Sequence, residues 1–93
     1  MNNHNRAKRE RRAVENFETL RMLPKGGRAV VKRISVGGEM GRRIRDMGIV
    51  PGTEFMVMGR APLKDPVEIK LKGYNLTLRN NEADHILVQA VEG

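Results

Sequence analysis

Apolar and polar positions alternate, or apolar residues follow one another in short β-branched runs, in five segments of the chain. The clearest alternation places Val67, Ile69 and Leu71 on one face of a strand and charged residues on the other. The first segment does not alternate strictly, which indicates a bulge or a strong bend. We predict β-strands over residues 28–35, 53–58, 66–72, 75–79 and 86–91.

A helical pattern is inserted after the first predicted strand, over residues 39–47. Met40, Ile44 and Met47 recur at spacings of four and three residues, which places them on one face of a helix. A single helical turn is predicted before the last strand, over residues 80–84, because an asparagine at its start can cap it.

The end of the predicted helix is also specified by the sequence. Gly48 suits the left-handed conformation that commonly follows a helix, and Ile49 can then fold back onto Ile44. Pro51 and Gly52 provide the fixed φ and the positive φ required at the central positions of a type II turn. We therefore expect the chain to reverse sharply after the helix.

These elements predict one mainly β domain. The composition is 39% apolar with two Phe, one Tyr and no Trp, so the core must be aliphatic. A tight connection at residues 72–75 predicts a hairpin. Five short strands can protect their edges by closing, so we expect a small SH3-like five-stranded barrel plugged at one end by the helix. The expected barrel core is Phe55, Val57, Val67, Ile69, Leu71, Leu76, Leu78, Ile86 and Val88.

The chain divides into a basic N-terminal extension, residues 1–23, and a domain, residues 24–93. The extension is expected to be partly disordered or helical, with an apolar stripe that includes Phe17 and Leu20. The chain has a net charge of +7, and the extension contains a basic arm that suits RNA, anionic lipid or an acidic protein surface, or is simply solvated. The arm comprises Arg6, Lys8, Arg9, Arg11 and Arg12.

The sequence contains few of the residues and motifs that catalysis requires. Cysteine is absent, Ser35 is the single serine, and His4 and His85 are the two histidines. Phosphate-binding glycine motifs are also missing. We expect neither an enzyme nor a cofactor. Weak metal-ligand candidates are Glu82, Asp84 and His85, which in the structural alternative only solvate a turn and begin a strand.

Two groups of side chains are candidates for binding a partner. Arg42, Arg43 and Arg45 should project from the helix, where arginines can make charge-assisted contacts with carboxylates or phosphates. Met56 and Met58 should lie on the outward face of their strand, because Phe55 and Val57 point inward. The alternative is that the N-terminal segment covers both methionines through Phe17 and Leu20.

The chain resembles the FeoA family of small cytosolic proteins associated with the ferrous-iron transporter FeoB. The stretches that match are GRAVVKRI, GRRIRDMGIVPGTEFMV and PVEIKLKGYNLTLRNNEADHILV. The resemblance implies an SH3-like fold, no catalysis and a cytoplasmic accessory or regulatory role in ferrous-iron uptake through contact with FeoB. It does not extend to the basic arm.

Binding of RNA or DNA through the arginine-rich arm is the alternative function. Small nucleic-acid-binding barrels usually add aromatic side chains that stack on bases, and this chain has few. No apolar run is long enough to span a bilayer, so we expect no direct insertion into a membrane. The sequence leaves the oligomeric state open.

Overall fold

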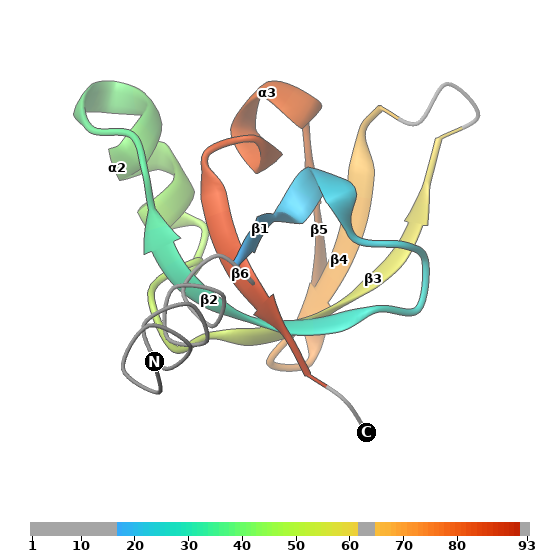
Figure 1. The fold of residues 1–93 in the computed structure, drawn as a ribbon. Coiled ribbons are helices and arrows are strands. Elements are labelled where there is room, and N and C mark those ends of the chain that lie inside the picture. The colour runs from blue at the N-terminus through green and yellow to red at the C-terminus, as the bar shows by residue number, and fades with distance from the viewer. Residues whose placement is uncertain (1–16, 62–64, 92–93) are drawn as a thin grey trace, which may run out of the picture.

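The computed structural model describes residues 17–61 and 65–91. In this part of the chain, six antiparallel strands form one sheet in the order β1-β6-β2-β3-β4-β5, with two α-helices and one 3-10 turn (Figure 1). The elements are β1 (Glu18–Thr19), η1 (Leu20–Met22), β2 (Arg28–Ile34), α2 (Gly38–Asp46), β3 (Glu54–Arg60), β4 (Val67–Leu71), β5 (Tyr74–Leu78), α3 (Asn80–Ala83) and β6 (Ile86–Ala90).

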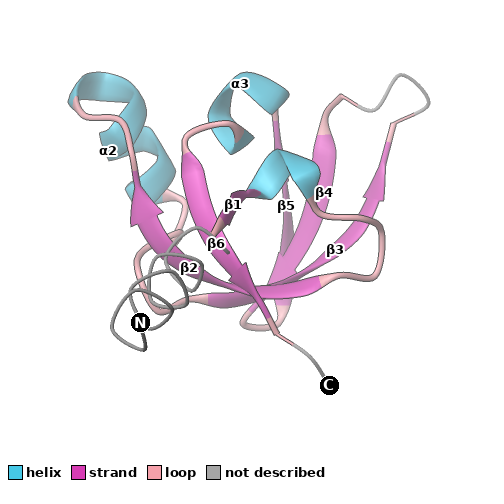
Figure 2. Cartoon of the chain, in the orientation of Figure 1, coloured by secondary structure: helices cyan, strands magenta, loops and turns pink. Residues whose placement is uncertain are grey.

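The sheet is strongly curved, and α2 and α3 both lie at its upper end in the view of Figure 2. The mainly β class, the inserted helix and all five predicted strands are confirmed. The predicted closure is wrong, because β5 and β1 occupy the two ends of the sheet order. Closing a five-stranded barrel would require β5 to pair with the outer edge of β6. That edge is occupied by β1, in which Glu18 pairs with Val88.

Irregular pairing bends the sheet at two positions. The register between β2 and β6 shifts between Val31 and Arg33, which confirms the bulge expected in the first strand. A second shift, between Val57 and Gly59 in the pairing of β3 with β4, was not predicted. The β4–β5 hairpin is confirmed, with Leu71 paired to Tyr74 across a two-residue turn.

The interior of the curved sheet contains the aliphatic core. Eight of the nine predicted barrel residues are buried, and Leu76 packs partly buried against them. On α2, Ile44 is fully buried, while Met40 and Met47 pack against the core. The core also contains Leu20, Leu23, Ala29, Val31, Ile49 and Ala83.

The N-terminal segment contains no α-helix where the structure describes it. Residues 18–22, for which the sequence allowed a helix, form the short strand β1 and the 3-10 helix η1. Leu20 and Leu23, which the sequence pattern places in the extension, lie in the domain core with 0% and 3% exposure. Tertiary burial of these two leucines therefore overrides the weak helical stripe. The predicted basic arm lies outside the described residues.

Candidate functional site

The helix α2 is formed by a sequence with few local start signals. Its N-cap is Gly37, which provides no side-chain hydrogen bond. The charges nevertheless agree with the helix dipole, because Glu39 lies in the first turn and Arg43 and Arg45 lie in the last. Packing of Ile44 into the core provides the tertiary support that a nine-residue helix needs.

The C-terminus of α2 has the predicted left-handed cap. Gly48 has a φ of +95°, and its N–H donates to the carbonyl of Arg45 at 2.9 Å. The N–H of Ile49 donates to the carbonyl of Ile44 at 3.4 Å. This pair of bonds is a Schellman motif, and both isoleucines are buried as the motif's apolar contact requires.

The turn that follows is also as predicted. The N–H of Thr53 donates to the carbonyl of Val50 at 3.0 Å, across Pro51 and Gly52, and Gly52 has a φ of +96°. The hydroxyl of Thr53 donates to the carbonyl of Gly48 at 3.3 Å. The helix end and the turn therefore form one hydrogen-bonded unit.

Tyr74 attaches β5 to this helix end. Its hydroxyl donates to the carbonyl of Met47 at 2.9 Å, although 43% of the residue remains exposed. The hydroxyl lies so close to Gly48 that a Cβ at that position would overlap it. The sequence gives no indication of this role for Tyr74, because a separation of 27 residues from Met47 leaves no local signal.

Arg43 connects α2 to α3 through Glu82. Its guanidinium lies 3.0 Å from the Glu82 carboxylate, whose side chain is only 8% exposed, whereas Arg43 is 64% exposed. The other carboxylate oxygen of Glu82 accepts the N–H of Arg79 at 2.9 Å. A candidate partner-binding residue and a candidate metal ligand are thus joined in one structural ion pair.

Arg42 and Arg45 differ from Arg43. Both are exposed on α2, and neither side chain forms an ion pair or hydrogen bond with the rest of the described chain. A pocket of about 310 Å³ opens beside Arg43 between α2, β5 and α3, and Met47 and Arg79 contribute to its lining. Arg42 and Arg45 are exposed on the same helix but are not among the residues that line this pocket.

The two candidate methionines are half-buried in β3. They alternate with buried Phe55 and Val57, as expected for the outward face, and Met58 lies at the register shift. Met56 lines a separate pocket of about 230 Å³ that includes Lys70 but no residue of α2. Leu20, which the alternative placed over the methionines, is fully buried in the domain core. Because no residue of α2 lines the Met56 pocket, the methionines and the arginines are separate features.

Two of the three metal candidates are engaged in ion pairs. Asp84 pairs with Arg21 at 3.0 Å, and Glu82 pairs with Arg43 at 3.0 Å. Within residues 17–61 and 65–91, no three His, Cys, Asp or Glu residues cluster as metal ligands would. Glu82 and Asp84 therefore act in the described fold as partners of arginines.

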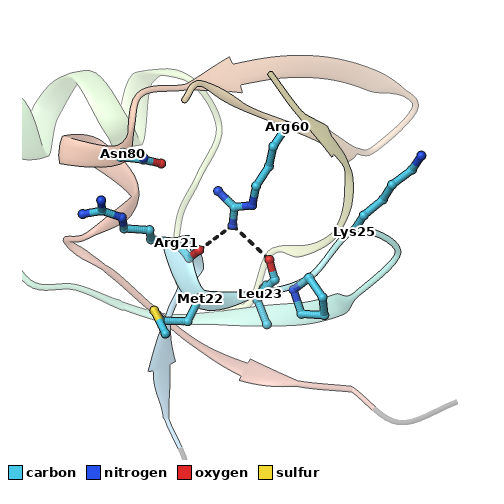
Figure 3. Close-up of a pocket in the computed structure, with 7 residues that line it drawn as sticks. Arg21, Met22, Leu23, Lys25, Arg60 and Asn80 are labelled. Atoms are coloured by element: carbon cyan, nitrogen blue, oxygen red, sulfur yellow. Dashed lines mark hydrogen bonds between the residues drawn. The ribbon is translucent and has the colours of Figure 1, made fainter. Parts of the chain in front are cut away.

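A cationic pocket at the η1 turn is a feature that the sequence pattern did not indicate. It has a volume of about 560 Å³. Figure 3 shows the side chains that line it. Its lining comes from three segments that are distant in the sequence, so no residue spacing could predict it. The residues that line it are Arg21, Met22, Leu23, Pro24, Lys25, Arg60 and Asn80.

The chain is similar in sequence to a protein of ferrous-iron transport. A curated fusion of Fe(2+) transport protein A with the Fe(2+) transporter FeoB, from Porphyromonas gingivalis, is 38% identical over 69 residues. The match covers 74% of this chain and 8% of the fusion protein, so the chain spans only a small part of that relative.

None of the helices in the described residues is both long and apolar enough to cross a membrane.

Two solved structures have a similar fold. The NMR structure of a FeoA-like protein from Clostridium acetobutylicum is 38% identical, with a TM-score of 0.78 over 83% of this chain and 90% of that one. The crystal structure of Stenotrophomonas maltophilia FeoA with zinc is 28% identical, with a TM-score of 0.67 over 76% of this chain and 88% of that one. That protein is described as an SH3 domain protein and suggested to be a ferrous iron transport activating factor. The FeoA domain model matches residues 18–90, and the chain belongs to the FeoA family.

Proposed function

We propose that this chain is a non-enzymatic accessory protein of ferrous-iron uptake that binds the cytosolic part of a FeoB-type transporter through α2. The observation that supports α2 as the contact is its pair of exposed arginines, Arg42 and Arg45. The helix that carries them is fixed by the hydrogen bond from Tyr74 and by the Arg43–Glu82 ion pair. The fusion of an FeoA-type segment to FeoB in a relative supports the choice of partner.

The proposed mechanism is docking by a preformed surface. The Schellman cap, the Tyr74 hydrogen bond and the Arg43–Glu82 ion pair fix α2 on the sheet before any partner arrives. A fixed helix loses little conformational entropy on binding, so Arg42 and Arg45 can form directional contacts with carboxylates at low cost.

The test is a binding titration of the full chain with the cytosolic domain of the FeoB from the same organism. Combined Arg42→Glu and Arg45→Glu should weaken binding at least about tenfold, since rim charges of the wrong sign repel the partner. The control combines Arg33→Glu and Lys70→Glu, which changes the net charge equally on exposed residues outside α2. Equal weakening by both variants would contradict the proposed interface.

The nucleic-acid alternative depends on the basic arm and is tested on the same chain. Replacing Arg6, Lys8, Arg9, Arg11 and Arg12 by Gln should leave FeoB binding intact if α2 is the interface. The nucleic-acid alternative predicts that the full chain is retained on an RNA column, that this retention falls steeply with salt, and that the variant is not retained. That result would favour the arm as a nucleic-acid contact.

A further inference from the structure

The cationic pocket at η1 lies apart from α2 and has a distinct composition. Three of its lining side chains, Arg21, Lys25 and Arg60, are cationic, and among the described residues its lining contains no carboxylate. Met22, at its rim, is 69% exposed, the highest value among the exposed large apolar residues of the described chain. Met22 therefore offers an apolar surface beside three cations.

Arg60 is held in position by the backbone it contacts. One terminal nitrogen, Nη2, donates to the carbonyl of Leu20 at 3.5 Å. The same nitrogen donates to the carbonyls of Leu23, at 2.9 Å, and Arg21 (Figure 3). The Nε and Nη1 atoms form no hydrogen bond within the described residues. The guanidinium is therefore oriented in advance and retains donors for a further acceptor.

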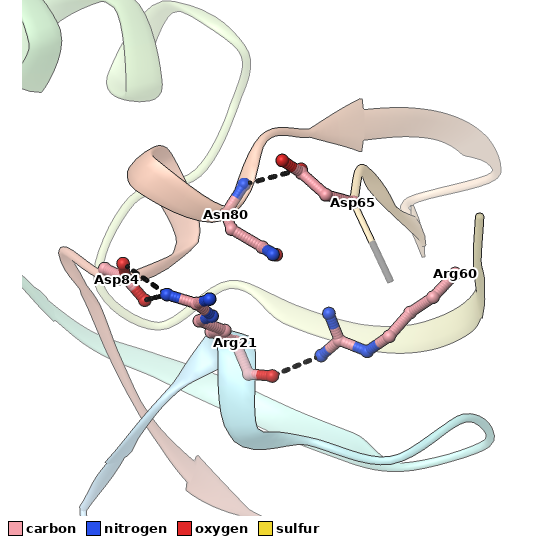
Figure 4. Close-up of polar contacts among 5 residues, drawn as sticks. All are labelled: Arg21, Arg60, Asp65, Asn80 and Asp84. Carbon is pink, nitrogen blue, oxygen red and sulfur yellow. Dashed lines mark hydrogen bonds and ion pairs between the residues drawn. The ribbon is translucent and has the colours of Figure 1, made fainter. Parts of the chain in front are cut away.

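The neighbouring carboxylates leave the pocket positive. Asp84 forms an ion pair with Arg21, and Asp65 accepts the backbone N–H of Asn80 at 2.9 Å (Figure 4). Three cations against these two anions leave a local charge of +1. Lys25 forms no contact with a carboxylate in the described chain, so Lys25 and Arg60 are the cations that a ligand would meet first.

The backbone of this segment disfavours phosphate. Phosphate sites typically use several backbone N–H groups, but among the residues that line this pocket Leu23 donates its N–H to the carbonyl of Leu20 at 3.1 Å, and Pro24 has no N–H. No aromatic residue lines the pocket in the part of the chain that the structure describes, so a nucleotide base would find no stacking surface. A carboxylate beside an apolar group matches the guanidinium, the ammonium and Met22 better.

We infer that this pocket binds an acidic, extended segment of a protein partner. An Asp or Glu carboxylate of that segment contacts Arg60 and Lys25, and a neighbouring apolar side chain packs on Met22 and Pro24. The inference goes beyond the proposed function, because it concerns a different face of the domain and holds whether or not α2 binds a transporter.

The test uses the full ¹⁵N-labelled chain and two synthetic peptides. Amide and arginine Nε–H signals are followed by NMR during titration with acetyl-Leu-Glu-Glu-Leu-Glu-amide and with its Gln counterpart. The acidic peptide should shift the signals of Met22, Lys25 and Arg60, and the Gln peptide should shift none of them. Inorganic phosphate and ATP are titrated in parallel.

Variants separate the pocket from general electrostatics. Lys25→Glu should weaken binding of the acidic peptide about five- to tenfold, and Met22→Ser about threefold, whereas Lys70→Glu should change it less than about twofold. Lys25, Met22 and Lys70 are all exposed, so these variants should fold normally. Equal losses for Lys25→Glu and Lys70→Glu, equal shifts by phosphate or ATP, or no shifts with the acidic peptide would overturn the inference.

Discussion

At the scale of single residues, Gly48 and Tyr74 depend on each other. Gly48 provides both the positive φ of the helix cap and the space that the Tyr74 hydroxyl occupies. The hydroxyl in turn satisfies the carbonyl of Met47, one of the last carbonyls of the helix. Any larger residue at position 48 would therefore disturb two interactions.

This dependence predicts that mutations of Gly48 and Tyr74 have non-additive effects on the free energy of unfolding. Tyr74→Phe should cost about 1 kcal/mol by removing a hydrogen bond, and Gly48→Ala should cost about 2 kcal/mol or more from backbone strain and the overlap with the hydroxyl. The double variant should be less destabilised than the two costs together, because the next Tyr74 atom lies 3.8 Å from the position of a Cβ on residue 48, which is an ordinary contact. Urea unfolding of the four proteins measures the coupling, and strict additivity would contradict it.

The three arginines of α2 also differ in how much each is expected to contribute to stability. Arg43→Glu should destabilise the domain by about 2–4 kcal/mol, because it places a carboxylate against the buried Glu82 and removes that residue's cationic partner. Arg42→Glu and Arg45→Glu should each change stability by less than about 0.5 kcal/mol, as exposed substitutions usually do. Thermal or urea denaturation checks this difference. Charge reversal is therefore expected to affect the fold at Arg43 but not at Arg42 or Arg45.

At the scale of elements, η1 anchors the start of the domain. Leu20 and Leu23 insert into the core on either side of exposed Met22, and Arg60 of β3 donates to the carbonyls of the same turn. A two-residue strand could not hold this segment alone, since β1 forms only two pairs with β6. The buried leucines and Arg60 therefore provide the stability that β1 lacks.

Burial of these leucines predicts where the folded domain begins. Leu20→Ala and Leu23→Ala should each lower the free energy of unfolding by about 2–4 kcal/mol, whereas Met22→Ala should change it by less than about 0.5 kcal/mol. Denaturant titration of the three variants measures the difference. Near-wild-type stability of both leucine variants would place the start of the domain at residue 24, as expected from the sequence.

At the scale of the whole molecule, the sequence predicted those structural features that depend on interactions between residues close together in the chain. The cap at Gly48, the turn at Pro51 and Gly52 and the β4–β5 hairpin each arise from neighbouring residues, and the β2 bulge was indicated by the irregular alternation within that strand. The open sheet does not, because it depends on β1 pairing with β6 across about seventy residues. The Arg43–Glu82 pair and the η1 pocket were missed for the same reason, since their partners meet only after folding.

The position of β6 in the sheet order has a consequence for synthesis. β6 lies between β1 and β2, so the last strand to leave the ribosome is the one that joins the first two. During translation, β2–β5 can pair in sequence, but β1 has no partner until nearly all of the described chain has emerged. Assembly of the complete sheet is therefore a late, long-range step, which slows folding relative to a domain built from local contacts.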